Sequence, residues 1–176
     1  VLKIYICNVM ARPKEFNYDE KLAIARNLFW KNGYNATSMT DLEKVMQINR
    51  SSMYQTYGSK HELFLKSLKN YIQKVDEQYS HAAQESDDPL QSIKNVVNSV
   101  VNAAIKDANC LFTKSIFELA LTDQAVSKLL EKHALKVVSF FEKLLVSAQN
   151  NGSISPDKDP RVLAHFIVSG LASINY

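Results

Sequence analysis

Residues 33–64 read GYNATSMTDLEKVMQINRSSMYQTYGSKHELF, and this stretch decides the fold. Ser38 and Asp41 have the spacing of an N-cap and its third helical residue, so they predict the start of a short helix. Asn49 is a favourable N-cap for a second short helix over residues 50–57. Two short helices joined by a turn of a few residues describe a helix-turn-helix unit.

Helical signals continue on both sides of this unit. Asn17 with Glu20, and Ser59 with Glu62, have the spacing of capping boxes. The chain has only four glycines and four prolines, too few for the turns of an all-β protein. We therefore expect an all-α protein, with an N-terminal three-helix head and a C-terminal helical-bundle body. The helices expected outside the motif cover residues 18–32, 60–84, 89–107, 111–121, 124–150 and 160–176.

Length and charge narrow the class of protein. The chain has 176 residues, which suits one domain or two small ones. It contains neither GxGxxG nor GxxxxGK[ST], so two common nucleotide-binding folds are excluded. The net charge of +3 is uneven, because residues 10–74 carry eleven Lys/Arg against six Asp/Glu, whereas residues 75–176 carry nine against twelve. This asymmetry favours a polyanionic partner for the first third alone.

The chain offers little for catalysis or metal binding. Cys7 and Cys110 form no CxxC pair, and three of the four histidines, His81, His133 and His165, are isolated along the sequence. We find no Ser-His-Asp set or paired carboxylates, so we expect neither an enzyme nor a bound metal or cofactor. The short apolar start lacks a cleavage site, and free thiols fit a reducing compartment. We expect a cytoplasmic protein without a membrane anchor.

The exposed face of the helix over residues 50–57 has the side chains that read DNA. Arg50 and Gln55 suit guanine and adenine edges, and the hydroxyls of Ser51 and Tyr54 suit phosphates or bases. On spacing alone, the same pattern also fits a small solvated helix in an ordinary bundle.

Residues 20–66 resemble the DNA-binding domain of TetR-type transcriptional repressors. The matching segments are Leu28-Phe29, Gly33–Thr40, Asp41-Leu42, Asn49–Tyr57 and Gly58–Phe64. The resemblance implies a homodimer that binds a pseudo-palindromic operator and leaves it when an unknown small molecule or electrophile binds. It divides the chain into a flexible extension or basic arm (1–12), a DNA-binding head (13–66) and an effector-binding and dimerisation body (67–176). Arg12 and Lys14 would act as a basic arm against the DNA backbone or minor groove, and a disordered charged tail is the alternative. The family usually has Ala-Gly where this chain has Met46-Gln47, so Gln47 must adopt a left-handed backbone conformation at a cost of ~1 kcal/mol.

The resemblance also assigns site residues by position. Thr37, Thr40 and Lys60 would contact phosphates, Lys60 at the positive N-terminus of its helix. The recognition helix and its cap would contribute Asn49, Arg50, Ser51, Ser52, Tyr54, Gln55 and Tyr57, although core packing is favoured for Tyr57.

The body resembles the family less distinctly. Asn109-Cys110-Leu-Phe is similar to a Gly-Cys-Leu segment in a branch with electrophile- and copper-responsive members. Cys110, near Lys106 and Lys114, is therefore a candidate sensor thiol, and a buried structural thiol is the alternative. Four aromatic residues of the body are candidates for lining an effector pocket: Phe112, Phe117, Phe140 and Phe141.

Two rival hypotheses remain at this level, and so does an expectation about assembly. The rivals are a helical carrier or enzyme that shares the bundle, and a constitutive DNA binder without an effector. Residues 124–150 and 160–176 carry more apolar surface than the body can hide, so we expect a four-helix interface between two protomers. The residues expected there are Phe140, Phe141, Leu163, Phe166, Ile167, Gly170, Leu171 and Ile174. We also expect the natural chain to continue beyond Tyr176.

Overall fold

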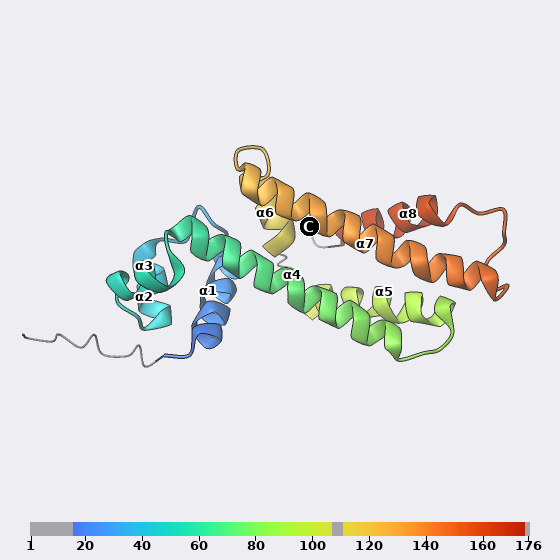
Figure 1. The fold of residues 1–176 in the computed structure, drawn as a ribbon, viewed down its shortest axis with the longest axis horizontal. Coiled ribbons are helices and arrows are strands. Elements are labelled where there is room, and N and C mark those ends of the chain that lie inside the picture. Colours follow the sequence, from blue (N-terminus) through green and yellow to red (C-terminus); the bar gives the residue numbers. More distant parts are fainter. Residues whose placement is uncertain (1–15, 107–110, 175–176) are drawn as a thin grey trace, which may run out of the picture.

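The computed structural model describes residues 16–106 and 111–174, and all regular structure in these ranges is helical (Figure 1). Eight helices occur there. They are α1 (Tyr18–Asn32), α2 (Met39–Met46), α3 (Arg50–Tyr57), α4 (Lys60–Gln84), α5 (Pro89–Lys106), α6 (Leu111–Leu119), α7 (Gln124–Asn150) and α8 (Pro160–Ser173). The all-α prediction is confirmed. Two helix ends differ from the expectation: α6 ends at Leu119 rather than at residue 121, and α8 ends at Ser173 rather than at residue 176.

Side-chain caps explain where these helices begin. The Ser38 hydroxyl accepts from the Asp41 N–H at the start of α2, and the Asp41 carboxylate accepts in return from the Ser38 N–H. Ser59 and Glu62 form the same reciprocal pair at the start of α4. Each pair satisfies two backbone N–H groups that a helix start leaves unpaired.

The turn between α2 and α3 has the expected strain. Gln47 has φ 53° and ψ 41°, which is the left-handed region, and its N–H donates to the Glu43 carbonyl at 3.0 Å. It is the only non-glycine residue with positive φ in the described ranges. Gln47 therefore holds a conformation that glycine adopts without strain, at the cost that a side chain adds there.

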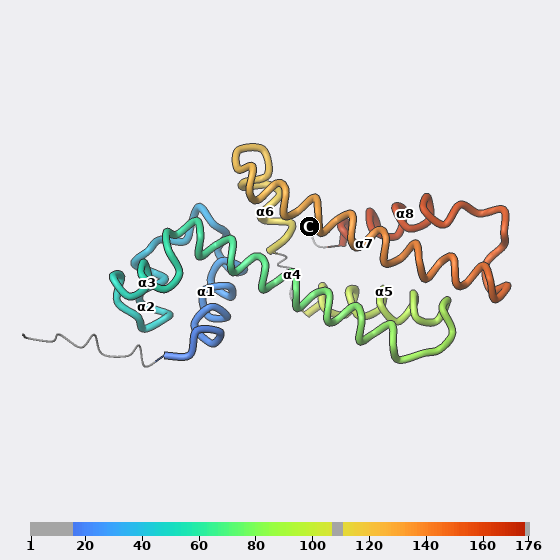
Figure 2. The backbone as a smooth tube through the Cα atoms, in the orientation of Figure 1, coloured from blue at the N-terminus to red at the C-terminus, as the bar shows by residue number. Residues whose placement is uncertain are grey.

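Two buried clusters hold the molecule together. The first joins α1–α4 to α6 and α7, with Phe29, Phe64 and Tyr57 among its fully buried members. The second joins α4, α5, α7 and α8 around Phe141. Figures 1 and 2 show α4 leading from the head into the body, with α5 alongside its C-terminal half. Helix α4 contributes to both clusters and so connects the head to the body.

Candidate DNA-binding surface and body cavity

Helix α3 divides into a buried face and an exposed face. Met53 is fully buried, and its burial fixes the orientation of the helix against α2 and α4. Arg50, Ser51 and Gln55 are exposed, and Tyr54 is 49% exposed. The structure therefore brings these four predicted side chains together on one solvent-facing surface.

A carboxylate that sequence reasoning missed orients Arg50. Glu43 of α2 accepts from the Arg50 backbone N–H at 3.1 Å, and its other oxygen lies 3.9 Å from the Arg50 Nε. The Arg50 Nη2 donates to the Thr40 hydroxyl at 3.1 Å. Thr40 and Arg50, predicted separately, are thus direct neighbours across the turn. The only sequence signal for this pairing is that Glu43 stands seven positions before Arg50.

The side chain of Asn49 caps the start of α3. The Asn49 side-chain oxygen accepts from the Ser52 N–H at 2.8 Å, so this oxygen is occupied by capping. The Asn49 side chain is exposed, and Ser52 is half-buried. Asn49 still has its amide N–H groups available for a phosphate or base.

Two side chains that were expected to contact DNA are buried instead. Thr37 is fully buried, and its hydroxyl donates to the Gly33 carbonyl at 2.6 Å. Tyr57 is fully buried and stacks on Tyr18, with ring centroids 4.8 Å apart, and its hydroxyl donates to the Tyr18 carbonyl. Burial raises the pKa of Tyr57 to about 12. Both side chains build the head, as was favoured for Tyr57.

Lys60 is the first residue of α4 and is half-buried. Its Nζ lies 4.3 Å from the centroid of the Tyr34 ring, a cation–π geometry. Burial lowers the pKa of Lys60, and the Glu118 carboxylate opposes this shift. The contact positions the ammonium group at the start of a helix, where a phosphate also binds favourably.

The body contains a cavity of about 490 Å³, lined by side chains of α1, α4, α5, α6, α7 and α8. This size is typical of small-molecule sites. Phe112 and Phe117 line it, as predicted. Phe140 and Phe141 do not, which corrects the prediction: Phe141 is fully buried in the second cluster, and Phe140 packs on it at 5.5 Å. Cys110, the candidate sensor, and Cys7 lie outside the described residues.

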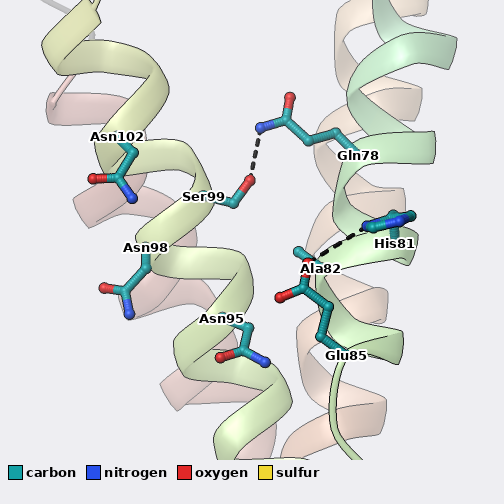
Figure 3. A pocket seen from close by; sticks show the side chains of 8 residues that line it. All are labelled: Gln78, His81, Ala82, Glu85, Asn95, Asn98, Ser99 and Asn102. Atoms are coloured by element: carbon teal, nitrogen blue, oxygen red, sulfur yellow. Dashed lines mark hydrogen bonds and ion pairs between the residues drawn. The ribbon is translucent and has the colours of Figure 1, made fainter.

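A second hollow of about 480 Å³ lies between α4 and α5. Figure 3 shows its polar lining, in which the Gln78 amide donates to the Ser99 hydroxyl at 2.7 Å and His81 pairs with Glu85 at 3.5 Å. Two pairs of its polar side chains bond to each other, and the hollow is open to solvent. It therefore resembles a solvated groove more than a binding site for an apolar effector.

Helix α6 connects the cavity to the head. The Lys114 Nζ donates to the carbonyls of Trp30 and Lys31 at 2.7 and 2.8 Å, at the end of α1. Glu118 accepts from the Asn35 N–H at 2.9 Å. Gly33 has φ 83°, a conformation that favours glycine, and a Cβ there would also displace the Glu118 carboxylate.

Family comparisons agree with this architecture. The pattern described as "Bacterial regulatory proteins, tetR family" matches residues 22–66, and "Tetracyclin repressor-like, C-terminal domain" matches residues 89–176. The second match alone covers half of the chain. The chain belongs to the TetR family. It is a DNA-binding transcriptional regulator, as the resemblance predicted.

Individual TetR-family relatives align along most of the chain. The uncharacterized HTH-type transcriptional regulator YezE of Bacillus subtilis (strain 168) is 27% identical over 172 residues, 95% of this chain and 88% of YezE. The HTH-type transcriptional repressor ComR of Escherichia coli (strain K12) is 28% identical over 163 residues, which are 89% of this chain and 76% of ComR. A cysteine mutant of the TetR-family regulator CifR, solved with a 26-bp operator DNA, superposes with a TM-score of 0.82 at 22% identity. The match covers 93% of this chain and 87% of the CifR chain, which shows the shared fold. None of the described helices of this TetR-family chain could cross a membrane.

Proposed function

We propose that this regulator is a homodimeric repressor that reads a pseudo-palindromic operator with the exposed face of α3 and is released when a small molecule occupies the body cavity. In this proposal residues 13–66 bind DNA, and residues 67–176 bind the effector and dimerise. The observation that carries it is the cluster of Arg50, Ser51, Tyr54 and Gln55 on one exposed helix face.

The contacts divide into two kinds. Arg50 and Gln55 carry the donor and acceptor groups that distinguish base edges in the major groove. Thr40 and Lys60 lie outside α3, and hydroxyl and ammonium groups there suit phosphates, which position the protein without reading sequence. Two copies of α3 in a dimer would enter successive major grooves roughly 34–36 Å apart.

DNA binding of variants tests these roles. An operator is first selected from a random pool with the wild-type protein, and anisotropy then measures binding to it and to random DNA. Gln55→Ala should lower the operator affinity by about tenfold or more and leave random DNA unchanged, because a base contact is worth ~1–3 kcal/mol. Lys60→Ala should weaken both DNAs equally and flatten the salt slope by ~1. Lys143→Ala, an exposed lysine on α7, is the control. Equal losses on both DNAs for Gln55→Ala would contradict base reading.

The dimer proposal rests on an apolar line along α8. Val162 and Phe166 are 63% and 78% exposed, and Gly170, one turn further, has open space around its Cβ position. Other members of the expected interface are inside the protomer, since Phe141 is fully buried and Leu171 is 7% exposed. Burying one Phe side chain is worth ~1.5–3 kcal/mol, so α8 has the surface for a symmetric contact.

Sedimentation equilibrium at micromolar concentration tests the dimer. The wild type should be a dimer, and Phe166→Glu should dissociate to monomers because it places a charge in an apolar contact. Leu121→Glu, at a 98% exposed position in the α6–α7 turn, should remain dimeric. A monomeric wild type, or an unchanged Phe166→Glu dimer, would overturn this part of the proposal.

The effector proposal rests on the path from the cavity to the head. Phe112 and Phe117 line the cavity from α6, and the same helix holds the end of α1 through Lys114. A molecule that displaces α6 would therefore change the position of α1 and the rest of the head. A ligand that favours one of two such arrangements shifts the population and so changes DNA affinity.

A further inference from the structure

Among the described residues, the charged side chains that line the body cavity are all basic. Three basic residues line it, Arg26 of α1, Lys74 of α4 and Lys106 at the end of α5. None of the described lining residues is acidic. The rest of the lining is mainly aliphatic and aromatic, with Trp30, Tyr71 and Phe112 among the aromatic residues. Positive charge around an apolar hollow favours a ligand that combines negative charge with an apolar body.

Arg26 is the side chain best placed to meet such a ligand. Its Nη1 donates to the Asn70 side-chain oxygen at 2.9 Å, and its Nε and Nη2 donate to the Asn27 side-chain oxygen at 3.3 and 3.0 Å. A guanidinium group has five N–H donors, so these three bonds leave two donors for another acceptor. Within residues 16–106 and 111–174, no carboxylate pairs with Arg26, Lys74 or Lys106.

The surroundings of Arg26 agree with an unbalanced charge. Burial lowers the pKa of Arg26, with the Tyr71 hydroxyl acting in the opposite direction. A partly buried cation without a carboxylate partner is costly until an anion approaches it. The two amide side chains hold the guanidinium in place but do not neutralise it.

The carboxylate of Asp76, next to the lining residue Val75 in the sequence, is already paired. His133 lines the cavity, and its Nδ1 lies 3.5 Å from one oxygen of Asp76, while the other Asp76 oxygen accepts from the Lys136 ammonium at 2.6 Å. Burial lowers the pKa of His133, and Asp76 opposes the shift. Asp76 is therefore neutralised from the outside by Lys136 and leaves no net negative charge for a cationic ligand.

We propose that the effector of this regulator is an amphipathic monoanion, an apolar chain or ring bearing one carboxylate, whose charge binds Arg26 with help from Lys74 while its apolar part fills the cavity. This inference rests on the proposed role of the cavity as the effector site and adds the chemical class of the ligand. The carboxylate accepts two N–H bonds from a planar guanidinium in the geometry that such pairs favour.

Trp30 makes the proposal directly measurable. It is the single tryptophan of the chain and lines the cavity, so its fluorescence reports occupancy. Three probes with the same ten-carbon chain, decanoate, decan-1-ol and decylammonium, are titrated below their micellar concentrations. Decanoate should bind at least about tenfold more tightly than decan-1-ol, a difference of ~1.4 kcal/mol, and decylammonium should bind most weakly.

Variants test whether the basic residues of the cavity lining cause the preference for decanoate. Arg26→Gln should lower decanoate affinity by about tenfold and leave decan-1-ol unchanged, because only the charged contact is lost. Lys74→Gln, at an exposed position, should lower decanoate affinity by a smaller factor and keeps the test valid if Arg26→Gln does not fold. Lys69→Gln is the matched control, an exposed lysine of α4 outside the cavity lining with the same change in net charge.

The outcomes separate the ligand class from the proposed release of DNA. Decanoate that binds as expected and weakens operator binding supports both. Equal or tighter binding of decan-1-ol or decylammonium overturns the anionic class, even if that probe releases DNA and so supports the effector site. Decanoate that binds through Arg26 without any change in operator affinity supports the ligand class and overturns the proposed release.

Discussion

Replacing Lys114 by Met tests the contact between α6 and the head. The Lys114 ammonium donates to the carbonyls of Trp30 and Lys31 in the last turn of α1, at 2.7 and 2.8 Å. Carbonyls at a helix end have no partner within the helix, and a cation there also interacts favourably with the helix dipole. Met keeps most of the aliphatic stem but removes both bonds.

The loss can be estimated from these contacts. A hydrogen bond to a charged group contributes about 1.5–3 kcal/mol to stability. One of the two Lys114 bonds is part-buried and the other is exposed, so solvent replaces the second more easily. We expect a total loss of ~2 kcal/mol in the free energy of unfolding. For a chain of this size the loss lowers Tm by ~4–8 °C.

Thermal unfolding followed by circular dichroism measures the effect. Lys128→Met is the matched control, since Lys128 is exposed on α7 and the structure gives its side chain no partner among the described residues; its change should stay within ~0.5 kcal/mol. If Lys114→Met and Lys128→Met lower Tm equally, the contact between α6 and α1 contributes nothing and the path from the cavity to the head loses its main support.

Three further predictions concern the head. Glu43→Gln should lower the ratio of operator to random-DNA affinity, measured by anisotropy, because Arg50 loses the carboxylate that orients it; an unchanged ratio would show that Glu43 is only a surface partner. Gln47→Gly should raise the free energy of unfolding by up to ~1 kcal/mol, since glycine adopts the left-handed conformation without strain. This appears as a higher urea midpoint at constant m, and a lower midpoint would contradict the strain. Hydrogen bonds from Ser38 and Ser59 lower the pKa values of Asp41 and Glu62, so their stabilisation is present above the unfolded pKa of ~4 and is lost as pH falls through the folded pKa. Tm measured from pH 7 to pH 3 should fall less steeply in the Asp41→Asn, Glu62→Gln double variant than in the wild type, and equal slopes would refute the role of these caps.

Local signals allowed most helix boundaries to be predicted from the sequence. The starts of α2 and α4 depend on residues three positions apart, and these pairs form in the structure as expected. The left-handed Gln47 was predicted from the family resemblance, because the family usually has glycine at this position. These features need no knowledge of what packs against the helix.

Features that depend on packing were less predictable. Thr37 and Tyr57 have side chains suited to DNA, but the first buried cluster encloses both. The stripe of α7 contains Phe140 and Phe141, and periodicity alone does not say whether an apolar stripe faces its own core or another protomer. The hydrogen bonds between Glu43 and Arg50 and between Lys114 and Trp30 were not predictable, because these residues come close together only in the folded chain.

The most direct test of the account is the specificity of the wild-type protein for DNA. Binding is measured over a series of salt concentrations for an operator selected from a random pool and for a random duplex of equal length. We predict an affinity ratio of at least ~10³, with both affinities falling linearly in log salt. A ratio near one at every salt concentration would contradict the claim that the exposed face of α3 reads base sequence.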